Sequence, residues 1–316
     1  MGAKPTSFQL TSSGPLRLYS TTELLSLPAP TWLVDRIIPA GGLVALYGPP
    51  GCGKSFVALD IALSVAAGRP WQGFPVEAGY VLYIAAEGGT GIGKRAKAWL
   101  LHNQVKPSQA DVAWLVESLS VHVDSDQMST LLERVMSELE FKPSLVIVDT
   151  LARCFDGDEN EQEDMGRFIA GVDHLRSQFE CTVLVIHHTR LAGDRERGNT
   201  AFRGACDAML SIEKDNQNIT VSCSKQKDAE EFEPIALDLI KVEDTDSCVV
   251  TRAGVNAQGE AQLAHMLETL AGLQPCTWDD WVNALKIPRA RVFTHIQTLR
   301  KDNLVTKVNG LWRVKA

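Results

Sequence analysis

Several features that mark other classes of protein are missing from this chain of 316 residues. It has no run of 18 apolar residues, which argues against a transmembrane helix, and its first residues (MGAKPTSFQLTSS) lack the apolar core of a signal peptide. Its seven cysteines form no C-x-x-C pair, which argues against zinc, and their odd number suits a reducing compartment. We therefore expect a soluble cytoplasmic protein with no membrane partner.

The composition is that of a globular protein, with 45% hydrophobic and 22% charged residues. The length allows one large domain, or one large and one small domain. Charge is unevenly distributed: the chain carries a net charge of −8, yet residues 258–316 hold eight lysines and arginines against five acids. A small basic unit joined to an acidic body indicates that the small unit contacts nucleic acid.

A phosphate-binding loop is the most specific motif in the chain. Residues 48–55 read GPPGCGKS and match the pattern G-x-x-x-x-G-K-[ST], between an apolar run at 43–47 and helical spacing at 55–67. This context predicts binding of ATP and Mg²⁺, with Lys54 on the β- and γ-phosphates and Ser55 on the ion. The residues expected to hold the nucleotide are Gly48, Pro49, Pro50, Gly51, Cys52, Gly53, Lys54, Ser55 and Phe56. For Cys52, a small filler residue and an oxidation-sensitive switch remain alternatives.

The order of the expected elements predicts the fold class. Between 41 and 250, apolar runs at 80–85, 145–148 and 182–186 alternate with helical patterns near 92–103, 128–141 and 161–179. Three further strands are expected at 207–213, 219–224 and 235–242, joined by short turns. This order predicts an α/β domain over 31–255: a mostly parallel sheet with helices on both faces and an antiparallel extension.

The two ends of the chain are expected to form separate parts. Residues 1–30 have no clear periodicity and predict a partly extended N-terminal arm, either packed on a neighbouring subunit or mobile. Residues 258–316 follow a polar linker and predict a winged helix, with helices at 262–271, 277–285 and 288–302 before a hairpin around Asn309-Gly310. Trp312 should pack in its core. The third helix is expected to contact DNA through Arg289, Arg291, Arg300 and Lys301.

Polar residues at the ends of three expected strands are candidates for catalysis. Asp149 follows an apolar run and is expected to hold the Mg²⁺ water shell, with a helix cap as the alternative. Glu87 is placed to polarise the attacking water, unless it is only a solvated loop acid. Of the pair His187 and His188, alternation predicts that one packs and the other, His188, senses the γ-phosphate; metal binding is the weaker alternative.

Basic residues in two later segments are candidates for contacts with partners. Arg195 and Arg197 lie in a long polar loop at 189–203 that is expected either to contact DNA phosphates or to be mobile and solvated. Lys225 and Lys227 alternate on a turn and could reach the nucleotide of a neighbouring subunit; exposed surface lysines are the alternative. The acidic run at 154–166 is expected to be solvated.

Together the motifs resemble the RecA-like ATPases, in particular the hexameric helicase branch typified by the plasmid replication protein RepA and the replicative helicase DnaB. The resemblance rests on GPPGCGKS, VLYIAAE, LVIVDT and VLVIHHTR, followed by Arg203-Gly204. It implies that Glu87 is the catalytic base and His188 the γ-phosphate sensor. It further implies that Lys225 and Lys227 act in trans, with Arg203 as a second candidate for the finger or for a DNA contact.

The resemblance also implies a function. It predicts an ATP-hydrolysing homo-oligomer, a hexameric ring by preference, that moves on single-stranded and also duplex DNA as a helicase or translocase in replication. Two alternatives remain open. One is a RecA-type recombinase or recombination mediator, and the other is a winged-helix DNA-binding protein whose assembly ATP controls.

Overall fold

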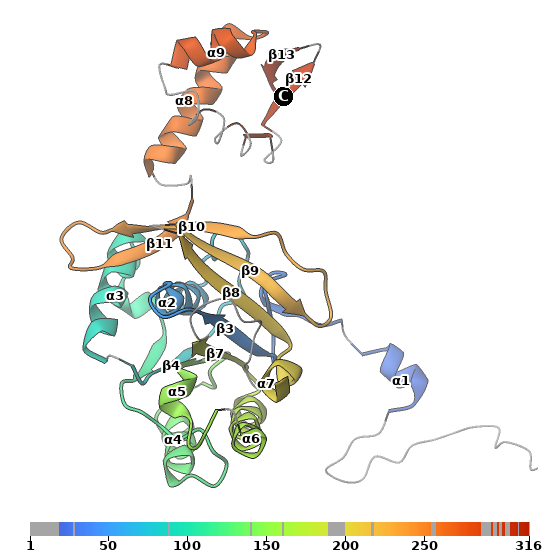
Figure 1. Ribbon diagram of the computed structural model, residues 1–316, viewed down its shortest axis with the longest axis vertical. Coiled ribbons are helices and arrows are strands. Elements are labelled where there is room, and N and C mark those ends of the chain that lie inside the picture. Colours follow the sequence, from blue (N-terminus) through green and yellow to red (C-terminus); the bar gives the residue numbers. More distant parts are fainter. Residues whose placement is uncertain are drawn as a thin grey trace, which may run out of the picture.

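The computed structural model describes residues 19–27, 29–87, 89–139, 141–159, 161–188, 200–215, 218–253, 257–285, 292, 296, 299–300, 304–308 and 310–315 (Figure 1). The helices are α1 (Thr21–Leu25), α2 (Lys54–Ala66), α3 (Gly89–His102), α4 (Asp126–Glu138), α5 (Leu151–Cys154), α6 (Gln162–Phe179), α7 (Thr200–Ala205), α8 (Ala257–Leu273) and α9 (Trp278–Leu285), with a 3₁₀ turn at Pro107–Gln109. The strands are β1 (Trp32–Val34), β2 (Ile38–Pro39), β3 (Leu43–Gly48), β4 (Val81–Ala85), β5 (Val112–Leu115), β6 (Leu145–Asp149), β7 (Thr182–His188), β8 (Ala208–Asp215), β9 (Asn218–Gln226), β10 (Ile235–Lys241), β11 (Cys248–Arg252), β12 (Val305–Val308) and β13 (Leu311–Val314).

One large sheet organises the body of the protein. Its strand order is β11-β10-β9-β8-β3-β7-β6-β4-β5. Neighbouring strands from β8 to β5 in this order pair in parallel, whereas β8, β9, β10 and β11 pair antiparallel. The prediction of a mostly parallel α/β sheet with an antiparallel extension is confirmed.

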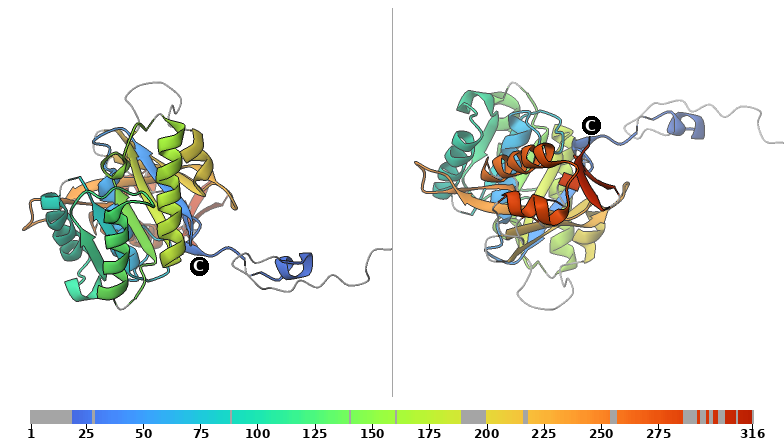
Figure 2. Two further views of the ribbon diagram at one scale, coloured as in Figure 1. Left: turned by 90° about the horizontal axis from the view of Figure 1, so that it is seen from below. Right: turned by 90° about the horizontal axis from the view of Figure 1, so that it is seen from above.

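Helices cover both faces of the sheet, as predicted (Figure 2). Side chains alternate along β3, so that Val44 and Leu46 pack with α2 and α3, while Leu43 and Ala45 pack with α4, α5, α6 and α7. Because both faces are covered, the central strands are apolar without interruption, which is why the sequence shows them as short continuous runs.

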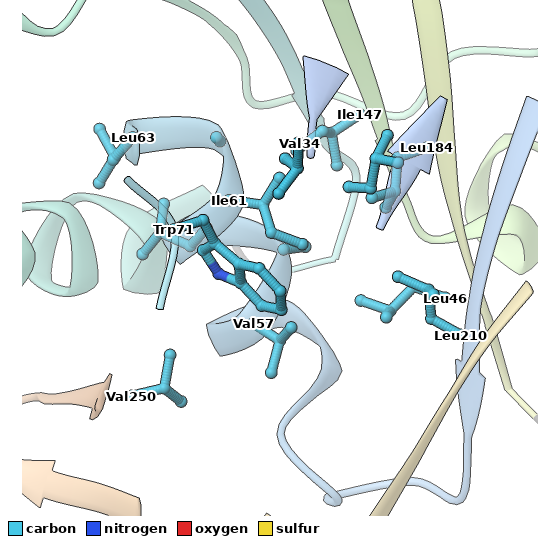
Figure 3. Packing of buried hydrophobic residues seen from close by; sticks show 14 of the residues in the cluster. Val34, Leu46, Val57, Ile61, Leu63, Trp71, Ile147, Leu184, Leu210 and Val250 are labelled. Atoms are coloured by element: carbon cyan, nitrogen blue, oxygen red, sulfur yellow. The ribbon is translucent and has the colours of Figure 1, made fainter. Parts of the chain in front are cut away.

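The α2 helix is buried over most of its length. Every residue from Val57 to Val65 is buried, including the polar Asp60 and Ser64. Figure 3 shows this packing, with the indole of Trp71 beside α2 and the residues of the central strands beyond it. A helix that starts at the phosphate loop is therefore fixed on nearly all sides by apolar contacts.

The strand register brings the predicted chemistry to one edge. In the parallel pairing of β3 with β7, Gly48 lies beside His188, and in the pairing of β4 with β6, Ala85 lies beside Asp149. The phosphate loop follows Gly48 and the Glu87 segment follows Ala85. Since parallel strands end at the same edge, these segments converge there.

The structure adds short elements that the sequence pattern did not predict. They are the hairpin β1–β2, the edge strands β5 and β11, and the helices α1, α5 and α7. Each of these elements is short, and β5 carries the partly exposed pattern of an edge strand rather than a buried apolar run. The N-terminal arm expected at 1–30 contains the helix α1, capped by reciprocal bonds between Ser20 and Glu23, while its first 18 residues lie outside the described part.

Residues from 257 onward have a core of their own. It contains Met266, Leu270, Cys276, Trp281, Val282, Leu285, Val292, Ile296, Leu299, Val305 and Trp312. The predicted capping of the 277–285 helix and the predicted hairpin are both present: Asp280 N donates to Thr277 Oγ1 at 3.2 Å, and β12 pairs antiparallel with β13. Most of the expected third helix lies outside the described residues, so the winged helix stays a prediction.

Candidate active site

The phosphate loop adopts a conformation that depends on glycine at two positions. Gly53 immediately precedes α2 with φ of 98°, and a Cβ there would approach Ile219 Cδ1 to 2.6 Å. At Gly48, a Cβ would collide with the backbone carbonyl of Ile212 in β8. The loop therefore lies directly against β8 and β9, and no side chain caps the N-terminus of α2 among the described residues. Uncapped N–H groups at a helix start favour an anion such as phosphate.

Lys54 is buried at the start of α2 and bonded to its own loop. Its Nζ donates to the carbonyl oxygens of Gly48 and Pro49, at 2.8 Å each, and Cys52 Sγ lies 3.9 Å away. Burial lowers the pKa of Lys54, and the nearby Cys52 and Asp149 oppose that effect. The ammonium group is thus held where phosphate oxygens can replace two carbonyl partners.

His188 joins Lys54 to Glu87. Its Nδ1 lies 3.0 Å from Nζ of Lys54, and its Nε2 lies 3.6 Å from Oε2 of Glu87. Because an ammonium group only donates, Nδ1 accepts from it, which places the ring proton of neutral His188 on Nε2, toward Glu87. Three residues from three separate motifs therefore form one chain of contacts, and a role of His188 as γ-phosphate sensor stays a prediction.

The other histidine packs, as alternation along the strand predicts. His187 approaches the ring of Phe202 with centroids 6.0 Å apart. Burial, with a smaller contribution from His188, lowers its pKa to about 4. His187 is therefore neutral near pH 7 and belongs to the apolar layer.

Asp149 and Ser55 meet at the centre of the site. The hydroxyl of Ser55 donates to Asp149 Oδ1 at 3.1 Å, and the hydroxyl of Tyr83 donates to Asp149 Oδ2 at 2.8 Å. Burial raises the pKa of Asp149, while the two hydrogen bonds oppose the rise. Burial raises the pKa of Tyr83 well above its usual value, so that its hydroxyl stays a donor.

The residues present fit Mg²⁺ with a nucleotide. A serine hydroxyl and a carboxylate are hard oxygen ligands of the kind that Mg²⁺ prefers, directly or through water. Thr150 supplies an independent observation: its Oγ1 is buried and has no hydrogen-bond partner among the described residues. A buried hydroxyl next to Asp149 without a partner is suited to bond with the water shell of an ion.

Three residues that the sequence analysis did not single out also lie here. Arg153 of α5 approaches Oε1 of Glu87 at 3.8 Å, Tyr83 contacts Asp149, and the guanidinium of Arg95 lies 4.7 Å from the ring centre of Phe56. The only signal for Tyr83 was its place in the strand motif VLYIAAE; Arg95 and Arg153 lie in helices whose faces cannot be assigned without the fold.

The remaining loop residues have different degrees of exposure. Cys52 is buried, which suits the filler interpretation, whereas Pro50 and Gly51 are exposed. Phe56 is partly buried and packs against the core beside α2. The exposed Pro50–Gly51 turn leaves the outer side of the loop accessible to a ligand.

Lys225 and Lys227, the candidates for action in trans, have different surroundings. Nζ of Lys225 donates to the carbonyl oxygens of Arg203, Gly204 and Cys206 at the end of α7, at 2.7, 3.2 and 2.5 Å. Lys227 is 62% exposed at its side chain and pairs with Asp207 at 3.4 Å. The ammonium group of Lys225 is therefore bonded within its own chain, and Lys227 is the more accessible of the two.

Most of the predicted DNA-binding residues lie outside the described part of the chain: Arg195, Arg197, Arg289, Arg291 and Lys301. Arg203 is exposed on α7. Arg300 is exposed, and its guanidinium lies 5.9 Å from the ring centre of Trp312. Trp312 itself is 6% exposed, which confirms the prediction that it packs in the small core.

Comparisons with known proteins identify a family and a structural likeness. A family model described as an AAA domain matches residues 18–194, more than half of the chain. Among solved structures, the chain is similar to one described as the crystal structure of the RadB recombinase. The two are 16% identical, with a TM-score of 0.48, over 64% of this chain and 88% of that one. No helix among the described residues is long and apolar enough to cross a membrane.

Proposed function

The chain belongs to the AAA domain family of P-loop ATPases, and we propose that it is a ring-forming DNA helicase or translocase driven by ATP hydrolysis. The observation that carries the proposed ATP hydrolysis is the contact chain Lys54–His188–Glu87, which connects the lysine of the phosphate loop to a candidate base through one imidazole. In such an arrangement, a γ-phosphate that contacts Lys54 or His188 also changes the surroundings of Glu87, the residue proposed to act on water.

Each residue at the edge has a definite task in this proposal. Lys54 exchanges its bonds to the loop carbonyls for bonds to phosphate oxygens, at little cost because both sets are charge-assisted. The hydroxyl of Ser55 and Oδ1 of Asp149, which now bond each other, are the groups that would hold the ion. When bound, Mg²⁺ neutralises charge that develops on the phosphates.

Glu87 is suited to remove a proton from water. Its side chain is 38% exposed, so water reaches it, and its two oxygens face Arg153 and His188 at 3.8 and 3.6 Å. Both contacts are longer than hydrogen bonds and leave the carboxylate able to accept one. Loss of such a base typically lowers the rate of hydrolysis by about 10²- to 10⁴-fold.

Assembly into a ring is proposed from the resemblance, and the structure indicates which lysine to test. Lys227 is the exposed candidate for reaching a neighbouring nucleotide, whereas Lys225 would first have to leave three carbonyl oxygens. A trans-acting charge contributes only where subunits meet.

Contact with DNA is proposed for the C-terminal unit, which is the basic part of an acidic chain. Lys307 and Arg313 on the β12–β13 hairpin are exposed, as is Arg300, so cationic groups are available there. Their contacts with phosphates would release counterions and make binding sensitive to salt.

A forked-duplex unwinding assay tests the proposal. We expect ATP-dependent separation of a labelled fork by the wild type and none by Lys54→Ala, since that change removes both binding and transition-state contacts. Electron microscopy with single-stranded DNA and a non-hydrolysable nucleotide should show closed rings. ATP-dependent filaments without unwinding would contradict the helicase and support a recombinase. DNA binding without either would favour an ATP-controlled DNA-binding protein.

A further inference from the structure

A buried tyrosine contacts the candidate metal-binding carboxylate at the oxygen that does not bond the phosphate loop. Tyr83 is fully buried in β4, and the hydrogen bond from its hydroxyl to Asp149 Oδ2 is 2.8 Å long. The strand register explains the contact: Ala85 pairs with Asp149 across β4 and β6, and Tyr83 lies two residues earlier on the same face. The long phenol side chain therefore reaches diagonally along the sheet to the end of β6.

The two oxygens of Asp149 have separate partners. Tyr83 holds Oδ2, and Ser55 holds Oδ1 at 3.1 Å. The phosphate-loop pattern assigns the hydroxyl of Ser55 to the metal ion, so Ser55 and Oδ1 of Asp149, which now bond each other, are the groups that would hold the ion. The hydroxyl of Tyr83 bonds the other oxygen, so it is a donor to Asp149 that does not compete with Ser55 for Oδ1.

The ring of Tyr83 is itself held in place by the edge of the sheet. Trp114 of β5 pairs with Tyr83 in the strand register, and their ring centres lie 5.2 Å apart. Trp114 is 37% exposed, so that one member of the pair is at the protein surface and the other is in the core. The hydroxyl end and the ring of Tyr83 are thus fixed by different residues on different strands.

We propose that Tyr83 is a positioning residue for the metal site: it fixes Oδ2 of Asp149 so that Oδ1 is directed to Ser55 and to Mg²⁺, and Trp114 keeps its ring in register. The inference rests on the proposed binding of Mg²⁺ with a nucleotide, and it gives Tyr83 a role that its place in the motif VLYIAAE does not assign. Partners of this kind that orient a metal-binding group typically change metal affinity or activity by about 10- to 100-fold when they are removed.

The test is a binding measurement that does not depend on turnover. A fluorescent ADP analogue is titrated into Tyr83→Phe and wild type, first in EDTA and then across a series of Mg²⁺ concentrations. We expect Tyr83→Phe to keep the affinity measured in EDTA and to need about 10-fold more Mg²⁺ for half of the Mg²⁺-dependent gain in affinity. A purely structural role would instead lower nucleotide affinity with and without Mg²⁺ to the same extent.

Two further variants make the result specific. Tyr80→Phe is the matched control, because Tyr80 precedes the same strand but stacks on Phe141, with ring centres 4.8 Å apart, and should leave the Mg²⁺ requirement unchanged. Trp114→Leu keeps the Tyr83 hydroxyl but releases its ring, and it should raise the Mg²⁺ requirement by less than Tyr83→Phe does. If Tyr83→Phe fails to fold, the Mg²⁺ requirement can still be measured in Trp114→Leu.

The outcomes separate this inference from the function on which it rests. An unchanged Mg²⁺ requirement in both Tyr83→Phe and Trp114→Leu would overturn the role of Tyr83 while leaving the ATPase intact. An equal loss of affinity in EDTA and in Mg²⁺ would also overturn it, because that result belongs to general damage. If the wild type binds no nucleotide under either condition, the proposed function fails and the inference fails with it.

Discussion

Asp149 and Asp60 are both buried aspartates, yet their surroundings differ, because one lies at the candidate nucleotide site and the other lies inside a helix. Asp149 ends a strand and is bonded by two hydroxyl groups, one of which belongs to the phosphate loop. Asp60 lies within α2 and is bonded by Trp99 Nε1 at 2.6 Å and by Gln72 Nε2 at 2.7 Å. An indole nitrogen only donates and does not coordinate a metal ion, and neither partner of Asp60 belongs to the phosphate loop.

Neighbouring groups reinforce the contrast. Around Asp149, Thr150 has a buried hydroxyl without a partner among the described residues, and Lys54 is bonded to carbonyl groups that a phosphate can displace. Around Asp60, the backbone carbonyl of Gln72 also accepts from Arg252 at 2.9 Å, which joins α2 and α3 to the end of β11. Exchangeable bonding thus marks the nucleotide edge, whereas in the middle of the same helix Asp60 is bonded by side chains that lie outside the phosphate loop.

The largest expected effect is on ATP hydrolysis, and it tests the nucleotide edge through a substitution at Glu87. Glu87→Gln should lower ATP hydrolysis by about 10²- to 10⁴-fold, because the amide keeps the shape of the side chain but cannot accept a proton. Affinity for Mg²⁺–ATP and the midpoint of urea unfolding should stay the same, since the side chain is 38% exposed and makes only long contacts. Steady-state turnover, nucleotide titration and urea unfolding measure the three quantities.

Glu138→Gln is a control for this prediction, because Glu138 is an exposed acid in an ion pair with Arg134, away from the nucleotide edge. It should leave all three quantities unchanged. A collapse of Mg²⁺–ATP affinity in Glu87→Gln would show that Glu87 holds the ion or the fold and does not act as a base.

The sequence predicted the residues that gather around Asp149 at the nucleotide edge, but it did not predict the network around Asp60. Gly48–Ser55, Glu87, Asp149 and His188 each stand at the end of an apolar run, and the parallel sheet brings strand ends together, so their meeting could be predicted. Tyr83 lies within the strand β4 and Asp60 within the helix α2, where the spacing of apolar residues predicts that a side chain is buried but not what it contacts. Their partners Trp114, Trp99 and Gln72 come from other segments, and only the tertiary packing brings them into contact.

The network around Asp60 can be tested through the pH dependence of the unfolding free energy. Burial raises the pKa of Asp60 from 3.8 to about 6, against the opposing effect of its hydrogen bonds. The folded protein therefore holds this proton more tightly than the unfolded chain, and the stability that results is present at low pH and is lost as pH rises through 6. Between pH 5 and 7.5 this loss amounts to about 1.4 kcal/mol.

Asp60→Asn removes the titration while keeping the shape of the side chain. The difference in unfolding free energy between variant and wild type, measured in urea at the two pH values, should move in favour of the variant by about 1.4 kcal/mol at pH 7.5. Asp246→Asn, at a side chain that is 88% exposed, should show no such change. A difference for Asp60→Asn that is independent of pH would contradict the raised pKa.

The smallest effect on the body is expected from removing residues 258–316. The Asp60 network ends at Arg252, which donates to Gln72 and lies over the ring of Phe74, and the following Ala253 N bonds to Ala236 O at 2.8 Å. The residues from 266 to 314 that are buried together form a core of their own. Basal ATP hydrolysis and Mg²⁺–nucleotide affinity should therefore change little in the truncated protein.

DNA binding should respond differently to the same truncation, and this difference decides what the C-terminal unit does. Removing these residues takes away eight of the chain's lysines and arginines and leaves an acidic body. Affinity for duplex DNA should fall, and the log–log dependence on salt should become flatter by about 0.9 for each phosphate group that the protein no longer binds. Fluorescence anisotropy across a salt series compares the full-length and truncated proteins. Equal affinities and equal slopes would contradict a DNA-binding role and leave docking of a protein partner as the function of this unit.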